Sequence, residues 1–249
     1  MARRAPDHRP FGPGPFVLGA GLKQRWQGWP FDLPAVEALE GLRFDAPVTF
    51  LVGDNGAGKS TLIEALAWAL GFDAQGGTTG DEMGIRVRGE NPLGAEIDLE
   101  LGECKPREQF FLRAESFFNF ARRVEANDLV DAYGGVSLHE QSHGESFLAL
   151  ASSRFGGERL YVLDEPEAAL SVTSALAFLG VMHHATQDGA QFIVATHSPI
   201  LLAFPGARIY ELHEGGVEEV SWEASDPVRL TRAFLDAPDR FLHEVVSGD

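Results

Sequence analysis

The chain is poor in cysteine, in lysine and in long apolar runs. Cys104 is the only cysteine among the 249 residues, which excludes an internal disulfide and any zinc site built from several cysteines. No apolar run approaches the roughly 18 residues that a membrane-spanning helix needs. Pro10, Pro13 and Pro15 interrupt the N-terminal segment, which lacks the continuous apolar core of a secretory signal. We therefore expect a cytoplasmic protein with no membrane partner.

Charge and composition narrow the class further. The chain has 20 Lys and Arg against 37 Asp and Glu, a formal net charge of −17. This balance argues against a surface that binds nucleic acid everywhere, although Arg86, Arg88 and the pair Arg122-Arg123 leave a local basic patch open. Hydrophobic residues make up 44%, enough for a sizeable core. Residues 1–15 read as a flexible tail, and no linker divides residues 16–249, which we expect to form a single domain.

Apolar bursts alternate with helical patterns along the chain. This rhythm predicts an α/β fold with a mostly parallel core sheet. The expected strands are 48–52, 109–114, 159–163 and 191–195. The expected helices are 60–70, 116–132, 144–153 and about 174–187, followed by two short amphipathic helices within 226–246.

The segment Gly53–Thr61 fits the pattern G-x-x-x-x-G-K-[ST] and lies between an expected strand and an expected helix. Glycines allow such a loop to turn its N–H groups inward around phosphate, and the helix N-terminus adds positive potential. Lys59 would reach the β- and γ-phosphates, Ser60 would ligate Mg²⁺, and Thr61 would contact the α-phosphate. The backbone of the intervening residues would complete the nucleotide cradle: Asn55, Gly56, Ala57 and Gly58.

Two further strands end in polar residues. The apolar strand 160–163 runs into Asp164 and Glu165, and the strand 191–195 runs through Thr196 to His197. Carboxylates at the exit of a buried strand are costly unless a metal or a cation compensates them. Asp164 would hold Mg²⁺, Glu165 would orient or deprotonate the attacking water, and His197 would contact the γ-phosphate or that water.

These spacings resemble the ATP-binding cassette (ABC) superfamily of P-loop NTPases. In that family a signature segment precedes the Asp-Glu strand, and a switch histidine follows it by a little over thirty residues. Here Ser142–Ser146 begins 22 residues before Asp164 (142 to 164), and His197 lies 32 residues after Glu165 (165 to 197). The resemblance implies an ABC-type ATPase head, with an N-terminal antiparallel β portion and a short helical lobe. It also implies ATP and Mg²⁺ as ligands.

The signature segment implies a second subunit. In this superfamily it completes the ATP site of the opposing subunit, so Ser142, Gly144 and Glu145 would contact nucleotide in trans and the chain would form an ATP-dependent homodimer. Beyond the first fifteen residues the chain also resembles small stand-alone predicted ATPases that are often labelled AAA-family. These stretches include Phe110–Phe118 and Ala195–Ala203.

Some family positions stay open. Ser171 stands where many relatives have Asp, and it is suited to cap the following helix. The inter-lobe Mg²⁺ ligand is either Gln109 or Glu115, and we favour Glu115 by its position. The adenine partner is unassigned among the aromatic and basic residues near the N-terminus: Trp26, Trp29, Phe31, Lys23 and Arg25.

Three functions fit the sequence. The first is a soluble ATPase that works as a nucleotide-gated homodimer, in DNA repair or maintenance or in phage defence, with a protein or DNA partner left open. The second is the nucleotide-binding subunit of a membrane transporter. The 27 residues from Glu115 to Ser142 (115 to 142) are shorter than the helical subdomain of transporter cassettes, which favours the soluble branch. The third is a nucleotide-gated module that does not hydrolyse ATP.

Overall fold

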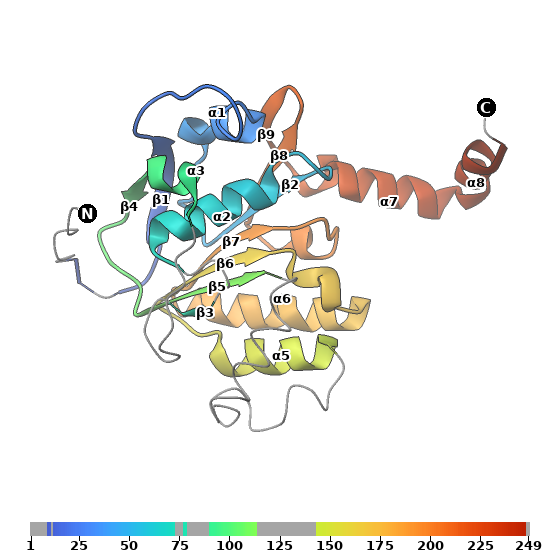
Figure 1. The fold of residues 1–249 in the computed structure, drawn as a ribbon. Helices are drawn as coiled ribbons and strands as arrows, with labels where there is room; N and C mark the ends of the chain where they lie inside the picture. Colours follow the sequence, from blue (N-terminus) through green and yellow to red (C-terminus); the bar gives the residue numbers. More distant parts are fainter. Residues whose placement is uncertain (1–8, 11, 73–76, 79–89, 114–142, 248–249) are drawn as a thin grey trace.

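The computed structural model describes residues 9–10, 12–72, 77–78, 90–113 and 143–247, to which all structural statements refer (Figure 1). The expected helix 116–132 lies outside these residues. None of the described helices is long and apolar enough to cross a bilayer.

A seven-stranded sheet forms the centre of the described fold, in the order β3-β5-β6-β7-β2-β8-β9. Its five inner strands, β5, β6, β7, β2 and β8, run parallel, and each edge strand is antiparallel to its neighbour. The carboxyl ends of the inner strands therefore meet at one edge of the sheet, where open α/β sheets bind their ligands. The strands are β2 (Val48–Gly53), β3 (Gly77–Thr78), β5 (Glu108–Arg113), β6 (Arg159–Asp164), β7 (Gln191–Ala195), β8 (Arg208–His213) and β9 (Gly216–Val220).

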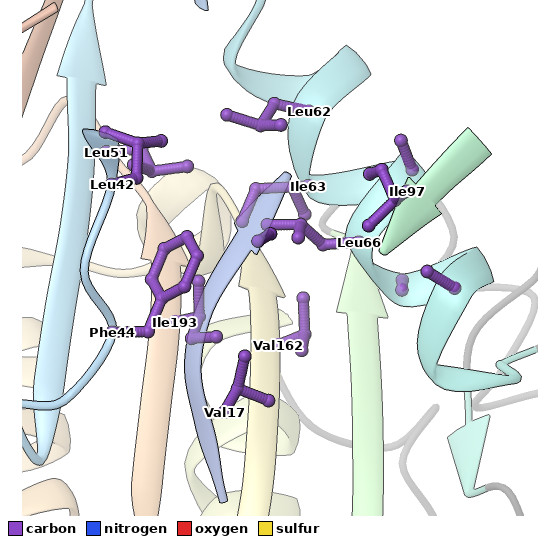
Figure 2. Packing of buried hydrophobic residues seen from close by; sticks show 14 of the residues in the cluster. Val17, Leu42, Phe44, Leu51, Leu62, Ile63, Leu66, Ile97, Val162 and Ile193 are labelled. Carbon is purple, nitrogen blue, oxygen red and sulfur yellow. The ribbon is translucent and has the colours of Figure 1, made fainter. Parts of the chain in front are cut away.

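Helices cover both faces of the sheet. Helix α2 (Lys59–Leu70) lies on one face, and α5 (His143–Arg154) and α6 (Val172–Gln187) lie on the other. Alternate residues of β2 serve the two layers: Phe50 packs with the α5–α6 side and Leu51 with the α2 side. Leu62, Ile63 and Leu66 of α2 share one buried cluster with Val162 and Ile193 of the sheet, and Figure 2 shows Ile63 and Leu66 on the side of α2 that faces these strands. Both cores consist of side chains removed from water, and this burial is the main stabilising contribution to such a fold.

A small antiparallel pair covers the α2 side. Strand β1 (Val17–Leu22) pairs with β4 (Ile97–Leu101), as expected for the N-terminal β portion. Buried Gln191 of β7 fastens this pair to the sheet: its Oε1 accepts from the N–H groups of Phe16 (2.7 Å) and Val17 (3.0 Å), and its Nε2 donates to the Val17 carbonyl (2.7 Å). Just before β1, the Gly14 N–H donates to the Gly189 carbonyl, so residues 12–15 lie against the body.

The remaining elements are short, apart from the two C-terminal helices. The turns are α1 (Pro34–Glu37), η1 (Leu39–Gly41), α3 (Pro92–Glu96), η3 (Pro166–Ala169), η4 (Leu201–Ala203) and η5 (Trp222–Ala224). Helices α7 (Asp226–Asp236) and α8 (Pro238–Ser247) confirm the two expected amphipathic helices and extend away from the sheet (Figure 1). Their exposed apolar side chains are Leu230, Phe234, Leu235, Leu242 and Val246.

One helix begins earlier than the sequence pattern indicates. Helix α6 starts at Val172 rather than near Ser174, because Ser171 is the N-cap. The Ser171 Oγ accepts from the backbone N–H of Ser174 at 3.1 Å, which satisfies a donor that the first helical turn leaves unpaired.

Candidate functional site

The loop between β2 and α2 has the geometry of an anion cradle. Gly56 and Gly58 adopt φ values of 88° and 91°, which side chains other than glycine rarely tolerate. The Leu62 N–H donates to the Gly58 carbonyl and closes the first turn of α2. Helix geometry therefore leaves the N–H groups of Lys59, Ser60 and Thr61 without an intrahelical acceptor, at the positive end of the helix. The backbone of this loop can therefore receive phosphate oxygens.

Lys59 is folded over its own loop. Its Nζ donates to the carbonyls of Gly53 (2.8 Å) and Asp54 (3.0 Å), and the residue is only 4% exposed. Burial lowers the pKa of Lys59, while the nearby carboxylates of Glu165 and Asp164 act in the opposite direction. A buried ammonium at the mouth of a glycine loop is suited to bind the phosphate chain of a nucleotide.

Ser60 and Asp164 form an oxygen pair across the site. The Ser60 Oγ donates to Asp164 Oδ1 at 3.1 Å, although the two residues lie on α2 and at the end of β6. Burial raises the pKa of Asp164 to about 6, and the Ser60 hydrogen bond and Arg113 oppose this shift. A hydroxyl beside a carboxylate is an oxygen donor set of the kind Mg²⁺ takes when phosphates and waters supply the rest of its octahedron. The described residues therefore fit Mg²⁺.

Arg113 is a site residue that the sequence analysis missed. It ends β5 and lies opposite Asp164 in the register of β5 and β6. Its Nη2 pairs with Glu64 Oε1 of α2 at 2.9 Å, and its Nε lies 3.7 Å from Asp164 Oδ2. Arg113 thus supplies positive charge next to Asp164. Its position at the tip of a strand, just before Glu115, is the only sequence feature that could have pointed to it.

Glu165 and His197 lie close together, at the ends of the neighbouring strands β6 and β7. His197 Nε2 lies 3.5 Å from Glu165 Oε1, an electrostatic contact rather than a short hydrogen bond. Glu165 has φ 50° and ψ 51°, a left-handed conformation that is strained for a residue with a side chain. Its N–H donates to the Ala195 carbonyl, which ties this conformation to β7. Backbone strain often clusters at functional sites, although Glu158, outside this site, has a similar φ of 56°.

A second acidic residue, Glu167 of η3, contacts the segment that carries His197. Glu167 Oε1 accepts from Thr196 Oγ1 at 2.7 Å and from the His197 N–H at 2.6 Å. Thr196 is fully buried, and its N–H donates to the Leu51 carbonyl of β2. The sequence analysis gave Glu167 no role, because nothing in its sequence neighbourhood reveals a partner thirty residues away.

The segment after His197 is fastened to the C-terminal part of the chain. The Trp222 Nε1 of η5 donates to the Pro199 carbonyl at 2.9 Å. The Arg232 guanidinium of α7 lies 4.5 Å from the centre of a Trp222 ring, a cation–π contact. Trp222 therefore links the strand end that delivers His197 to the helix that leaves the body.

The expected signature segment is only partly within the described residues. Ser142 and Glu115 lie outside them. Gly144 is buried near the start of α5, whereas Glu145 is exposed. Helix α5 packs on α6 and against η3, the turn that follows Glu165. Contact of Ser142, Gly144 and Glu145 with a second subunit's nucleotide stays a prediction.

Two cavities adjoin the phosphate loop. One, of about 680 Å³, is lined by Asn55, Gly56, Ala57, Pro34 and the β8–β9 turn. The other, of about 600 Å³, lies between Gly53, His197, the end of β8 and the start of α7. The adenine partner stays unassigned: Trp26 lies 5.8 Å from Phe31, centre to centre, and Trp29 is 77% exposed.

Two family models match the chain. The first, described as "AAA domain", matches residues 34–123. The second, described as "AAA domain, putative AbiEii toxin, Type IV TA system", matches residues 128–203. The first match contains the phosphate loop, and the second contains the strands that end in Asp164 and in Ala195.

The curated relatives are ATP-binding proteins. The cytochrome c biogenesis ATP-binding export protein CcmA of Rhizobium meliloti is 30% identical over 182 residues, which cover 65% of this chain and 82% of that protein. The xylose/arabinose import ATP-binding protein XylG of Sulfolobus acidocaldarius is 30% identical over 209 residues, covering 74% and 81%. The ribose import ATP-binding protein RbsA 1 of Streptomyces avermitilis is 26% identical, and the chain spans 42% of its length.

The solved structures that match include the SMC head domain from Thermotoga maritima, with a TM-score of 0.43 and 16% identity. That match covers 72% of this chain and 92% of the head domain. The SmcHead bound to the C-winged helix domain of ScpA gives a TM-score of 0.45 at 12% identity. The family itself follows from the curated relatives, two of which match at 30% identity over more than four fifths of their length. The chain belongs to the ABC family of P-loop ATP-binding proteins.

Proposed function

We propose that the protein hydrolyses ATP and works as a homodimer that ATP closes. The observation that supports this most strongly is the meeting of two pairs at one edge of the sheet: Ser60 with Asp164, and Glu165 with His197. Ser60 and Asp164 are suited to bind a metal ion, and Glu165 and His197 are suited to bind the attacking water. The phosphate cradle lies beside both, so a bound triphosphate would meet all three.

Binding rests on the loop and on Lys59. The N–H groups of residues 55–61 receive the phosphate oxygens, and Lys59 Nζ exchanges the carbonyls of Gly53 and Asp54 for the β- and γ-phosphates. Ser60 and Asp164 would hold Mg²⁺ from the protein side, and the bound ion would supply positive charge against the charge that develops on the phosphates. Thr61 contacts the α-phosphate.

Hydrolysis rests on Glu165 and His197. Glu165 orients the attacking water and accepts its proton, and His197 contacts the γ-phosphate from the neighbouring strand. Both side chains are between a third and a half exposed, so the second subunit is needed to exclude bulk water. Ser142 and Gly144 of that subunit contact the γ-phosphate and make closure depend on ATP.

The Glu165→Gln variant tests this proposal. It keeps the size of the side chain and removes the base, so ATP binding persists while the hydrolysis rate falls by about 100-fold or more. The particle mass of Glu165→Gln, measured by light scattering, doubles when ATP and Mg²⁺ are added. Glu223→Gln is the matched control, because Glu223 is an exposed carboxylate on η5. A Glu165→Gln protein that hydrolyses ATP like the control would remove Glu165 from the mechanism.

A second candidate function is the ATP-binding subunit of a transporter. It is supported by the relatives, whose names describe import and export ATP-binding proteins. In that case the protein in its own cells would sediment with membranes and be released by detergent but not by salt. A protein that stays in the supernatant and hydrolyses ATP without membranes supports the homodimer instead.

A further inference from the structure

The Glu167 side chain connects the segment that follows Glu165 to the segment that carries His197. It lies in η3, two residues after Glu165, in the connection that leads from β6 to the start of α6. Its carboxylate reaches β7, where Oε1 accepts from both Thr196 Oγ1 and the His197 N–H. One oxygen atom therefore joins the connection after Glu165 to the residue that bears the imidazole.

Fold stability alone does not account for this carboxylate. The other oxygen, Oε2, is buried and has no hydrogen-bond partner among the described residues. A buried polar atom without a partner destabilises a fold, whereas an apolar side chain of similar size at this position would avoid that cost. By contrast, the two bonds at Oε1 are charge-assisted and short, the kind that fixes geometry.

The backbone around His197 needs such an anchor. Ladder pairing of β7 with β2 ends where the Thr196 N–H donates to the Leu51 carbonyl, so the His197 N–H is the first donor past the sheet. Thr196 Oγ1 also accepts from the Ser198 N–H at 3.0 Å, which bends the chain after His197. Glu167 thus binds one group on each side of the Thr196–His197 peptide bond, the Thr196 hydroxyl and the His197 N–H.

We propose that Glu167 is a positioning residue for ATP hydrolysis, which holds His197 in the orientation that faces Glu165 and the γ-phosphate. The inference rests on the proposed function and adds a residue to that site. Glu167 lies in η3, and Leu170–Ser171 connect η3 to α6. A displacement of this connection would therefore reach His197 through one carboxylate oxygen, Glu167 Oε1. This role requires no contact between Glu167 and the nucleotide.

Three substitutions of Glu167 distinguish the effect of side-chain length from the effect of its negative charge. Glu167→Gln keeps an acceptor oxygen at the same distance and is expected to retain kcat within about threefold of the wild type. Glu167→Asp keeps the charge but shortens the side chain by one methylene, and Glu167→Ala removes the acceptor. For both we expect kcat to fall by about tenfold or more while the KM for ATP changes by less than about twofold. Glu223→Ala, on the exposed surface of η5, is the control and retains both constants.

Coupling to the histidine distinguishes positioning from a general structural effect. In a His197→Ala background, Glu167→Ala is expected to lower kcat by less than about twofold further, because the two act as a unit. A multiplicative loss in that background, or an unchanged kcat in Glu167→Ala, overturns the inference. If Glu167→Ala does not fold, Glu167→Asp decides: wild-type kcat in that variant overturns the inference.

A readout independent of catalysis keeps the two proposals apart. The His197 amide proton, hydrogen-bonded to a carboxylate, is expected to resonate downfield in the wild type and to move upfield in Glu167→Gln and Glu167→Ala. A resonance that does not move in Glu167→Ala, which removes the acceptor, shows that Glu167 does not hold His197. Loss of activity in Glu165→Gln with normal activity in Glu167→Ala overturns this inference alone, whereas normal activity in Glu165→Gln overturns the proposed mechanism.

Discussion

At the scale of single residues, the site concentrates buried charge. Asp164 is 6% exposed, and its carboxylate is offset by the Ser60 hydroxyl and by Arg113, not by a close ion pair. Burial therefore raises the pKa of Asp164 to about 6. An ionised group held this way lowers the stability of the metal-free protein and is retained because the site needs it.

This gives a pH-dependent prediction for the metal-free protein in EDTA. The folded-state pKa of Asp164 lies above that of the unfolded chain, so its contribution to stability improves as pH falls from above 6 towards 4. Asp164→Asn removes the buried charge and is expected to raise the free energy of unfolding at pH 8 by about 1–3 kcal/mol. The advantage over the wild type shrinks as pH falls to 4 in urea titrations. An advantage independent of pH would contradict this origin.

Substitution of two glycines of the loop by alanine is expected to lower the free energy of unfolding by different amounts. A Cβ on Gly53 would lie 2.3 Å from the Leu212 carbonyl oxygen of β8, whereas a Cβ on Gly56 would meet nothing within 4 Å. Gly56→Ala should therefore cost only the left-handed backbone penalty, about 1–2 kcal/mol. Gly53→Ala adds a backbone clash and should cost at least about 2 kcal/mol more. Urea unfolding of both variants checks the difference, and equal stabilities would contradict it.

At the scale of elements, the ends of three neighbouring inner strands each supply one part of the site. β2 supplies the phosphate loop, β6 supplies Asp164 and Glu165, and β7, which lies between them, supplies His197. This order places the histidine beside both the loop and the carboxylates without a long side chain having to span the gap.

The start of α6 offers a test of local helix capping. Ser171 accepts from the Ser174 N–H, so Ser171→Ala is expected to lower the free energy of unfolding by about 1 kcal/mol, whereas Ser171→Asp retains the cap and interacts well with the helix N-terminus. Chemical denaturation of both variants measures this. Ser171→Ala with wild-type stability would show that the cap contributes nothing.

The sequence predicts the parts of the site that local pattern determines. The glycine loop, Asp164, Glu165 and His197 follow from motifs at strand ends, and parallel strands bring such ends together. The roles of Arg113 and Glu167 could not be predicted, because they depend on which strand lies beside which and on side-chain reach across strands. Gln191 illustrates the same limit: a polar residue in an apolar strand gives no sign that it binds β1.

At the scale of the whole molecule, a net charge of −17 opposes self-association. Two acidic copies repel each other most strongly at low salt. We therefore expect the ATP-dependent dimer fraction of Glu165→Gln, at fixed protein concentration, to rise between about 50 and about 300 mM salt as screening increases. Sedimentation velocity measures it. A dimer that weakens steadily with salt would indicate that ion pairs hold it.

DNA binding would show the reverse dependence. A local basic patch that contacts phosphates loses affinity as salt rises, because releasing condensed counterions into a more concentrated salt solution is less favourable. Titrating a duplex with and without ATP, over the same salt range, therefore separates a DNA partner from self-association.

The indole of Trp222 is an intrinsic fluorescent probe of the segment that follows His197. It hydrogen-bonds to Pro199, two residues past the histidine, and lies under a guanidinium of the outgoing helix. The emission of an indole responds to such neighbours. In a chain whose other three tryptophans, Trp26, Trp29 and Trp68, are replaced by phenylalanine, fluorescence would therefore follow motion of this strand end in real time, without an attached dye.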